Sequence, residues 1–216
     1  LAYVADATSG VQVIDVSDPQ DPQITGSVDT PGFAHEVQLS GDHAYVADGS
    51  SGLQVIDISD PQHPQIVASV DTLAVDIARG IKLFGDHAFV AYGGSGLQVI
   101  DISDPQHPQI IASVDTPNYA WGVAVASGCA YVADGSSGLQ VIDISDPQDP
   151  RIIASMVTPG HAYDLAVEGN QAFLVNGSNG FLILPLPMGI PSISVESDTR
   201  LSATLPRPHM AGQYNL

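Results

Sequence analysis

Leu-Gln-Val-Ile-Asp-Ile-Ser-Asp-Pro-Gln stands at residues 53–62 and returns unchanged at 97–106 and 139–148. A near-identical copy, Val-Gln-Val-Ile-Asp-Val-Ser-Asp-Pro-Gln, stands at residues 11–20. Self-similarity at a fixed period of about 20–50 residues indicates a repeat architecture in which each copy is one structural unit. Residues that are the same in every copy are expected to serve the common scaffold. A specific site is therefore expected where the copies differ.

A second recurring segment fixes the period of the repeat. Ala-Tyr-Val-Ala-Asp or a close variant occurs at residues 2–6, 44–48, 88–92, 130–134 and 172–176. Successive copies are thus 42 or 44 residues apart, and the two extra residues fall between Asp71 and Arg79.

Each unit contains four short segments that suit β-strands and are separated by turn signals. In the second unit the predicted strands are residues 34–39, 44–47, 53–58 and 66–70. Glycines and paired prolines between them favour tight turns and stop strand pairing. Four strands in about 40 residues are the signature of a β-propeller blade. A parallel β-helix is the structural alternative, but its coils are usually shorter and lack four turn signals.

The third predicted strand carries the motif of a known family. Leu-Gln-Val-Ile-Asp-Ile-Ser-Asp-Pro resembles the LVIVD repeat family of bacterial and archaeal surface and secreted proteins. The resemblance covers residues 1–187 and implies β-propeller blades and an extracellular or cell-surface location, but no established chemistry. The fifth unit departs from the motif, since Phe-Leu-Ile-Leu-Pro-Leu-Pro at 181–187 lacks the aspartate and the Asp-Pro turn.

The predicted fold is therefore an all-β propeller with about five visible blades, of which the first and last are incomplete or atypical. Because the first unit lacks its innermost strand, we expect a fragment of a larger ring with further domains in the same polypeptide. Residues 188–216 differ in kind from the repeats. Two interpretations remain open for them: residues 190–195 form the outer strand of the last blade, or the segment begins an immunoglobulin-like β-sandwich.

The charge balance is strongly acidic, with 24 Asp and Glu against five Lys and Arg, for a formal net charge of −19. Such a field repels nucleic acids and anionic membrane surfaces, so neither is an expected partner. Acidity also keeps a β-rich protein soluble. No segment approaches the ~20 apolar residues of a membrane-spanning helix. Cys129 is the single cysteine, so an internal disulfide is excluded.

Repeated carboxylates are the first candidates for chemistry. One set ends the third strand and a second set follows three residues later; these are Asp15, Asp57, Asp101 and Asp143, then Asp18, Asp60, Asp104 and Asp146. Calcium is the possible ligand of such pairs, but the Asp-x-Asp-x-Asp-Gly pattern of a dedicated calcium loop is absent. Turn capping is the favoured role, and neither a metal site nor a cofactor is predicted.

Other repeated polar positions are also assigned to the scaffold. Asp6, Asp48 and Asp134 end the second strand, where they are expected to cap the amides of the following hairpin. The turn positions hold His43, His87, Cys129 and Gln171 in one set, and His63, His107, Asp21 and Asp149 in the other. We expect these turn residues to be exposed. Cys129 is not expected to be a nucleophile, because no base stands at a defined offset.

The position nine residues before the second-strand alanine varies most between the units. It holds His35, Arg79, Trp121 and Tyr163. Each follows an alanine that is present in all four units: Ala34, Ala78, Ala120 or Ala162. These side chains are expected to converge at the mouth of the central channel. The neighbouring positions add Phe33, Tyr119, His161, Glu36 and Asp164.

Aromatic rings beside an arginine and carboxylates resemble peptide- or sugar-recognition surfaces. Tolerated drift at a solvent-facing position explains the same variation. Strict alternation along the strand is expected to send Glu36 and His35 to opposite sides.

The leading interpretation is a non-catalytic binding or scaffold propeller that recognises a protein, peptide or glycan across its linker face. A first alternative is a structural, self-assembling surface component whose outer-edge groups, such as Thr25 and Gln54, pair between molecules. A second alternative is a hydrolase or lyase at the channel mouth, using Arg79, Tyr163, Glu36 and Asp164. Against an enzyme, Glu36 and Asp164 lie three repeats apart, whereas glycoside hydrolysis needs two carboxyls about 5–10 Å apart.

Overall fold

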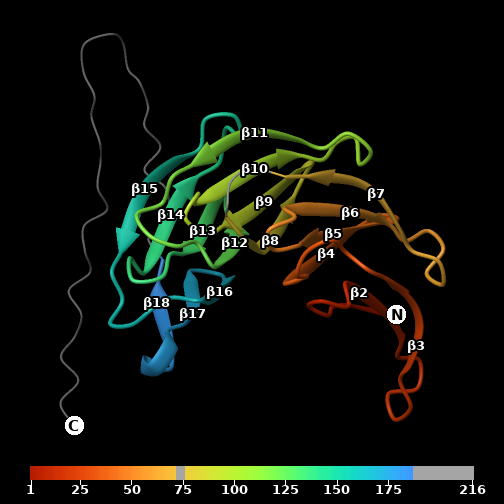
Figure 1. Cartoon of the computed structure of the whole chain (residues 1–216). Coiled ribbons are helices and arrows are strands. Elements are labelled where there is room, and N and C mark those ends of the chain that lie inside the picture. Colours follow the sequence, from red (N-terminus) through yellow and green to blue (C-terminus); the bar gives the residue numbers. More distant parts are fainter. Residues whose placement is uncertain (72–75, 187–216) are drawn as a thin grey trace.

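The computed structural model describes residues 1–71 and 76–186, and their strands form five antiparallel sheets (Figure 1). The first sheet contains β1 (Ala2–Ala5), β2 (Val11–Asp15) and β3 (Gln23–Val28). The second contains β4 (Glu36–Ser40), β5 (His43–Ala47), β6 (Leu53–Asp57) and β7 (Gln65–Val70). The third contains β8 (Ala78–Phe84), β9 (His87–Tyr92), β10 (Leu97–Asp101) and β11 (Gln109–Val114). The fourth contains β12 (Gly122–Ala126), β13 (Cys129–Ala133), β14 (Leu139–Asp143) and β15 (Arg151–Met156). The fifth contains β16 (Asp164–Glu168), β17 (Gln171–Val175) and β18 (Phe181–Pro185).

The sheets are the blades predicted from the repeats. Each full blade is a meander of four strands in chain order, and the four strands expected in the second unit are present with ends shifted by up to two residues. Every strand pair within residues 1–71 and 76–186 is antiparallel, which excludes a parallel β-helix for this part of the chain. The predictions for residues 187–216 lie outside the described residues.

Successive blades fan out from a centre formed by β4, β8, β12 and β16 (Figure 1). Apolar side chains from adjacent blades fill the space between the sheets. Tyr45 and Val55 of the second blade, for example, belong to one buried cluster with Ile81, Val90 and Ile100 of the third. A central blade therefore buries both of its faces, and this explains why its third strand is apolar at consecutive positions.

The repeated Leu-Gln-Val-Ile-Asp motif forms the third strand of each full blade. In β6, Leu53, Val55 and Ile56 are completely buried and Gln54 is 2% exposed. The Gln54 side-chain amide donates to the carbonyl of Ser51, so the motif glutamine closes the preceding hairpin. The expectation that Gln54 pairs between molecules is wrong, because a buried side chain with an internal partner is unavailable to a neighbour.

Buried aspartates join the second and fourth blades to the linkers that precede them. Asp48 accepts hydrogen bonds from the Thr30 hydroxyl at 2.6 Å and the Gly32 amide at 2.8 Å. Asp134 accepts the Thr116 hydroxyl at 2.8 Å and the Asn118 amide. These carboxylates thus satisfy groups of the linker, whereas the sequence predicted capping of their own hairpin. The sequence signal for this hydrogen bond between linker and blade was a threonine 18 residues before each aspartate.

Blade three builds the same junction from a different residue. Tyr92 occupies the position of Asp48, and no carboxylate is available there. Asp76, from the linker that carries the extra residues, instead accepts the Gly94 amide at 2.9 Å and the Ser95 hydroxyl at 2.8 Å. The hydrogen bond between linker and hairpin is kept, but its acceptor has moved from the hairpin to the linker.

The described residues form one short 3-10 helix, η1 (Gly177–Asn179), besides the strands. Across residues 1–71 and 76–186, no helix has the length and apolar character needed to cross a bilayer.

Candidate functional site

Backbone bridges to the preceding blade fix the entrance of the innermost strands. Ala34 forms a two-hydrogen-bond bridge with Ala7 of the preceding blade, with N···O distances of 3.0 and 3.1 Å. The bridges Gly49–Ala78, Gly93–Ala120 and Gly135–Ala162 repeat this arrangement. The alanine that precedes each entrance residue is at most 3% exposed, so a larger side chain would not fit; these are Ala34, Ala78, Ala120 and Ala162. The residue after each alanine is thereby held at the junction of two blades.

The entrance residues His35, Trp121 and Tyr163 lie where two consecutive residues of the chain face a single residue of the adjacent strand. The His35 amide donates to the Ala47 carbonyl, while Glu36 is the register partner of the same Ala47. Trp121 and Tyr163 make the corresponding bonds to Ala133 and Val175. This is β-bulge geometry, which turns side chains out of strict alternation. The expectation that Glu36 and His35 lie on opposite sides is therefore wrong, since both line one cavity.

The four entrance residues and their neighbours surround a cavity of about 390 Å³, which we call the hub cavity. Its lining comes from four consecutive blades: His35, Glu36, Arg79, Gly80, Trp121, Gly122, Tyr163 and Asp164. Six of these eight residues were singled out from the sequence. Their role in ligand binding stays a prediction.

Arg79 is the positive centre of the hub cavity. Its guanidinium carbon lies 4.2 Å from the Trp121 ring centroid and 5.6 Å from that of Tyr119, a cation–π arrangement. The Arg79 Nε is buried without a hydrogen-bond partner, and among the described residues no carboxylate forms a salt bridge with this arginine. The guanidinium therefore contacts aromatic faces and has no salt-bridge partner among the described residues.

Aromatic side chains continue outward from the cavity. Trp121 and Tyr163 meet edge to face at 4.9 Å, and Tyr119 packs on Trp121 at 5.1 Å. Three predicted residues do not line the cavity and instead stand next to it: Phe33 lies 4.9 Å from His35, and Tyr119 and His161 contact Trp121 and Tyr163. Phe33 is 46% exposed and Tyr163 39%, so the aromatic surface is open to a ligand.

Two carboxylates share the hub cavity although they lie three repeats apart. Glu36 accepts the Ile81 amide at 2.9 Å, from the neighbouring innermost strand, and the Gln38 side chain at 3.1 Å. Asp164 uses one oxygen, Oδ1, to accept the Leu165 amide at 2.8 Å. Burial is the main cause of the raised pKa of Glu36, and repulsion from the Asp164 charge adds to it. Separation by three repeats therefore does not keep these carboxyls in separate sites.

Gly80 and Gly122 are cavity residues that sequence reasoning missed. A Cβ atom on Gly80 would lie 2.9 Å from the Cα of Gly122, and one on Gly122 would lie 2.8 Å from Oδ1 of Asp164. The innermost strands therefore approach too closely for any side chain at these positions. The available signal was a glycine directly after Arg79 and Trp121, where the other two units carry an acid.

Burial changes the pKa values of two groups in the hub cavity. It lowers the pKa of His35, and the charge of Arg79 lowers it further, so the imidazole is neutral at neutral pH. Burial raises the pKa of Glu36, while the Ile81 and Gln38 hydrogen bonds act in the opposite direction. The hub cavity thus contains the positive charge of Arg79 together with two acidic side chains, Glu36 and Asp164.

Comparison with known proteins agrees with the blades and the repeat motif. The model of the LVIVD repeat matches residues 1–30, 31–72, 77–116, 117–158 and 159–184. The chain belongs to the LVIVD repeat family. No curated protein was found to match it.

Two solved structures show the same fold as this LVIVD-repeat chain. A crystal structure of the computationally designed Ika8 protein has a TM-score of 0.68 at 11% identity, over 85% of this chain and 55% of Ika8. The designed Ika4 protein has a TM-score of 0.62 at 11% identity, over 76% of this chain and 98% of Ika4. The LVIVD-repeat chain thus spans little more than half of Ika8. At this identity the likeness extends to the fold alone.

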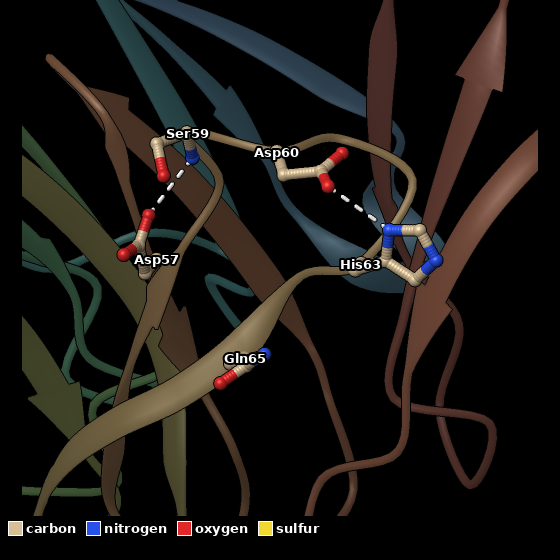
Figure 2. Close-up of a pocket in the computed structure, with 5 residues that line it drawn as sticks. All are labelled: Asp57, Ser59, Asp60, His63 and Gln65. Atoms are coloured by element: carbon tan, nitrogen blue, oxygen red, sulfur yellow. Dashed lines mark hydrogen bonds and ion pairs between the residues drawn. The ribbon is translucent and has the colours of Figure 1, made fainter.

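The Asp-Pro loop of the second blade lines a second pocket, shown in Figure 2. Asp57 accepts the Ser59 amide at 2.8 Å, and Asp60 lies 2.9 Å from Nδ1 of His63. These hydrogen bonds lower the pKa of both carboxyls. The same contacts recur around Asp101 and Asp104, so they belong to the scaffold.

The carboxylates of these loops do not gather into a metal centre. Within the described parts of the chain, no three His, Cys, Asp or Glu side chains come together as potential ligands. Each loop carboxylate instead accepts a backbone amide two residues ahead, as in a capped turn.

The turn positions divide into two groups. His63 and His107 are exposed, as expected. Cys129 is 2% exposed, so the expectation of an exposed turn residue is wrong for this position, which begins β13 and packs into the blade. Burial raises the pKa of the Cys129 thiol. Such a group is a poor nucleophile at neutral pH.

Proposed function

We propose that this LVIVD-repeat chain is a non-catalytic binding module of a secreted or cell-surface protein that recognises a protein, peptide or glycan through the hub cavity. The observation that carries the proposal is the Arg79 guanidinium, which has no salt-bridge partner among the described residues and lies over the rings of Trp121 and Tyr119. Arginine and aromatic side chains dominate the energetics of recognition surfaces.

The contrast between the frame and the hub supports a recognition role. The alanine bridges and motif strands repeat from blade to blade, whereas the four entrance residues differ in size and charge. A rigid frame that presents varied side chains at one mouth is a common arrangement for binding. The secreted or surface location rests on the family resemblance.

Charge narrows the range of partners. A net charge of −19 opposes polyanions, so nucleic acids and anionic membranes are poor candidates. Proteins, peptides and glycans with basic or neutral surfaces are the favoured partners.

The proposal is tested by probing peptide and glycan arrays with the labelled chain and with a double variant, Arg79→Ala with Trp121→Ala. We expect the wild-type chain to bind a subset of spots and the double variant to lose them, with little change in melting temperature. His63→Ala with Gln65→Ala, in the loop pocket of Figure 2, is the matched control and should retain the spots. Equal binding by the cavity double variant refutes the proposal.

A hydrolase or lyase is the second candidate, favoured by the shared cavity of Glu36 and Asp164. A raised carboxyl pKa beside a second carboxyl is typical of acid–base pairs. Both Glu36 oxygens, however, already accept hydrogen bonds from the protein. Hydrolysis of a chromogenic glycoside panel that disappears in Glu36→Gln would support the enzyme, and its absence at every pH tested would exclude glycosidase activity on those substrates.

A further inference from the structure

Arg79 has the properties of a receptor for a planar oxyanion. The guanidinium carbon lies 4.2 Å from the Trp121 ring centroid, and the described residues offer Arg79 neither a hydrogen-bond acceptor nor a salt-bridge partner. A guanidinium offers parallel N–H groups that match a carboxylate in bidentate geometry. Arg151, by comparison, is paired with Asp149. The unmet hydrogen-bonding capacity at Arg79 therefore points to a carboxylate supplied from outside.

Asp164 provides a charge of the opposite sign in the same cavity. Its Oδ1 accepts the Leu165 amide, while its Oδ2 has no partner among the described residues. Glu36 differs, since both of its oxygens are engaged by Ile81 and Gln38. Asp164 is thus the carboxylate that is free to accept a donor from a ligand, and an ammonium group satisfies it best.

We infer that the hub cavity binds a small zwitterion, with the ligand carboxylate on Arg79 and its ammonium group on Asp164. This inference rests on the proposed function and names the ligand class for the same site. The cavity volume of about 390 Å³ lies in the range of small-molecule sites, roughly 300–1,000 Å³. A cavity of this volume has room for a compound of amino-acid size.

A ligand with one charge, or with none, matches the cavity less well. A simple anion meets the repulsion of Glu36 and Asp164, and a simple cation meets that of Arg79. A neutral sugar leaves the charges of Arg79 and Asp164 without a charged partner. A zwitterion compensates both signs at once.

Trp121 makes the test specific, because it is the single tryptophan of the chain. Its fluorescence is titrated with glycine, β-alanine, γ-aminobutyrate and 6-aminohexanoate, which separate the two charges by increasing lengths. Hexanoate and hexylammonium are the chain-matched controls, and glucose is the neutral control. We expect a saturable change with at least one zwitterion, and binding about tenfold or more tighter than either singly charged control.

Variants then assign the two contacts. Because Arg79→Gln also alters the surroundings of Trp121, variants are measured by calorimetry as well. Arg79→Gln and Asp164→Asn should each weaken binding about tenfold or more, whereas His63→Ala should not. Arg79→Lys, which keeps the charge but loses the bidentate fork, should retain part of the affinity. Unchanged melting temperatures verify that the variants are folded.

Three outcomes overturn the inference: no zwitterion binds, a singly charged control or glucose binds as tightly, or Asp164→Asn has no effect. If the zwitterions fail while array ligands still require Arg79 and Trp121, the proposed function stands and the zwitterion assignment falls. If both fail, the hub cavity is not a binding site.

Discussion

Asp48 and Asp134 are completely buried, and each ties its blade to the linker that precedes it. Burial raises the pKa of both carboxyls, and the hydrogen bonds from threonine and backbone oppose this effect. Blade five carries Asn176 at the same position, where an amide in the correct orientation reaches Thr158 and Gly160. A neutral side chain can therefore serve the same junction.

This comparison predicts how Asp134→Asn changes the pH dependence of stability. The folded-state pKa of Asp134 lies above its ordinary value of 3.8, so its stability contribution is complete below that value and is lost as the pH rises through the raised pKa. Asparagine does not titrate. The free energy of unfolding of Asp134→Asn relative to wild type should therefore increase as the pH rises through this window, measured by urea unfolding.

Asp149→Asn is the control for the direction in which the free energy of unfolding changes with pH. The Arg151 side chain lowers the pKa of the exposed Asp149, so the relative stability of that variant should change in the opposite direction and by little. A pH-independent difference for Asp134→Asn would contradict the assigned role.

At the scale of the element, the hairpin between the second and third strands of a blade depends on one backbone conformation. Gly138 has a φ of +75°, and a Cβ there would lie 2.2 Å from the Met156 carbonyl oxygen. Gly128, in the turn before β13, has nearly the same φ of +74° but open space around it. The two glycines separate the cost of backbone strain from that of steric overlap.

Gly128→Ala should destabilise the chain by about 1–2 kcal/mol, the cost of placing a side chain on a left-handed backbone. Gly138→Ala should cost clearly more, because the neighbouring strand must also move away. Thermal and urea unfolding of both variants measure this difference. Equal destabilisation would show that the close packing around Gly138 is not a constraint.

The strands were predictable because repetition, turn residues and apolar pattern agree at every blade. The junctions between blades were not, since their hydrogen bonds join residues from different units, as Asp48 joins Thr30. Asp76 shows the limit most clearly. Tyr92 stands where other blades carry the aspartate of the hairpin, and Asp76 of the linker accepts the hydrogen bonds instead. The spacing of residues within one repeat does not predict that an acceptor on the linker takes this role.

At the scale of the whole molecule, the repeats bring residues from four blades into one cavity. The entrance position was predictable, because the four units keep the alanine and vary the residue that follows it. The placement of Glu36 was not, since it depends on a bulge that breaks alternation at Ala47. Nor was the proximity of Glu36 and Asp164, which follows from the curvature of the array and has no local signal.

The most direct test of the central claim, that successive blades converge on the hub cavity, is the emission spectrum of Trp121. Arg79→Ala and Tyr163→Ala remove contacts from the preceding and following blades, and each should shift the emission maximum. Lys82→Ala, on β8 beside Arg79 but outside the cavity lining, should leave it unchanged. Identical spectra for wild type and both cavity variants, with the fold retained, would contradict the convergence of the blades.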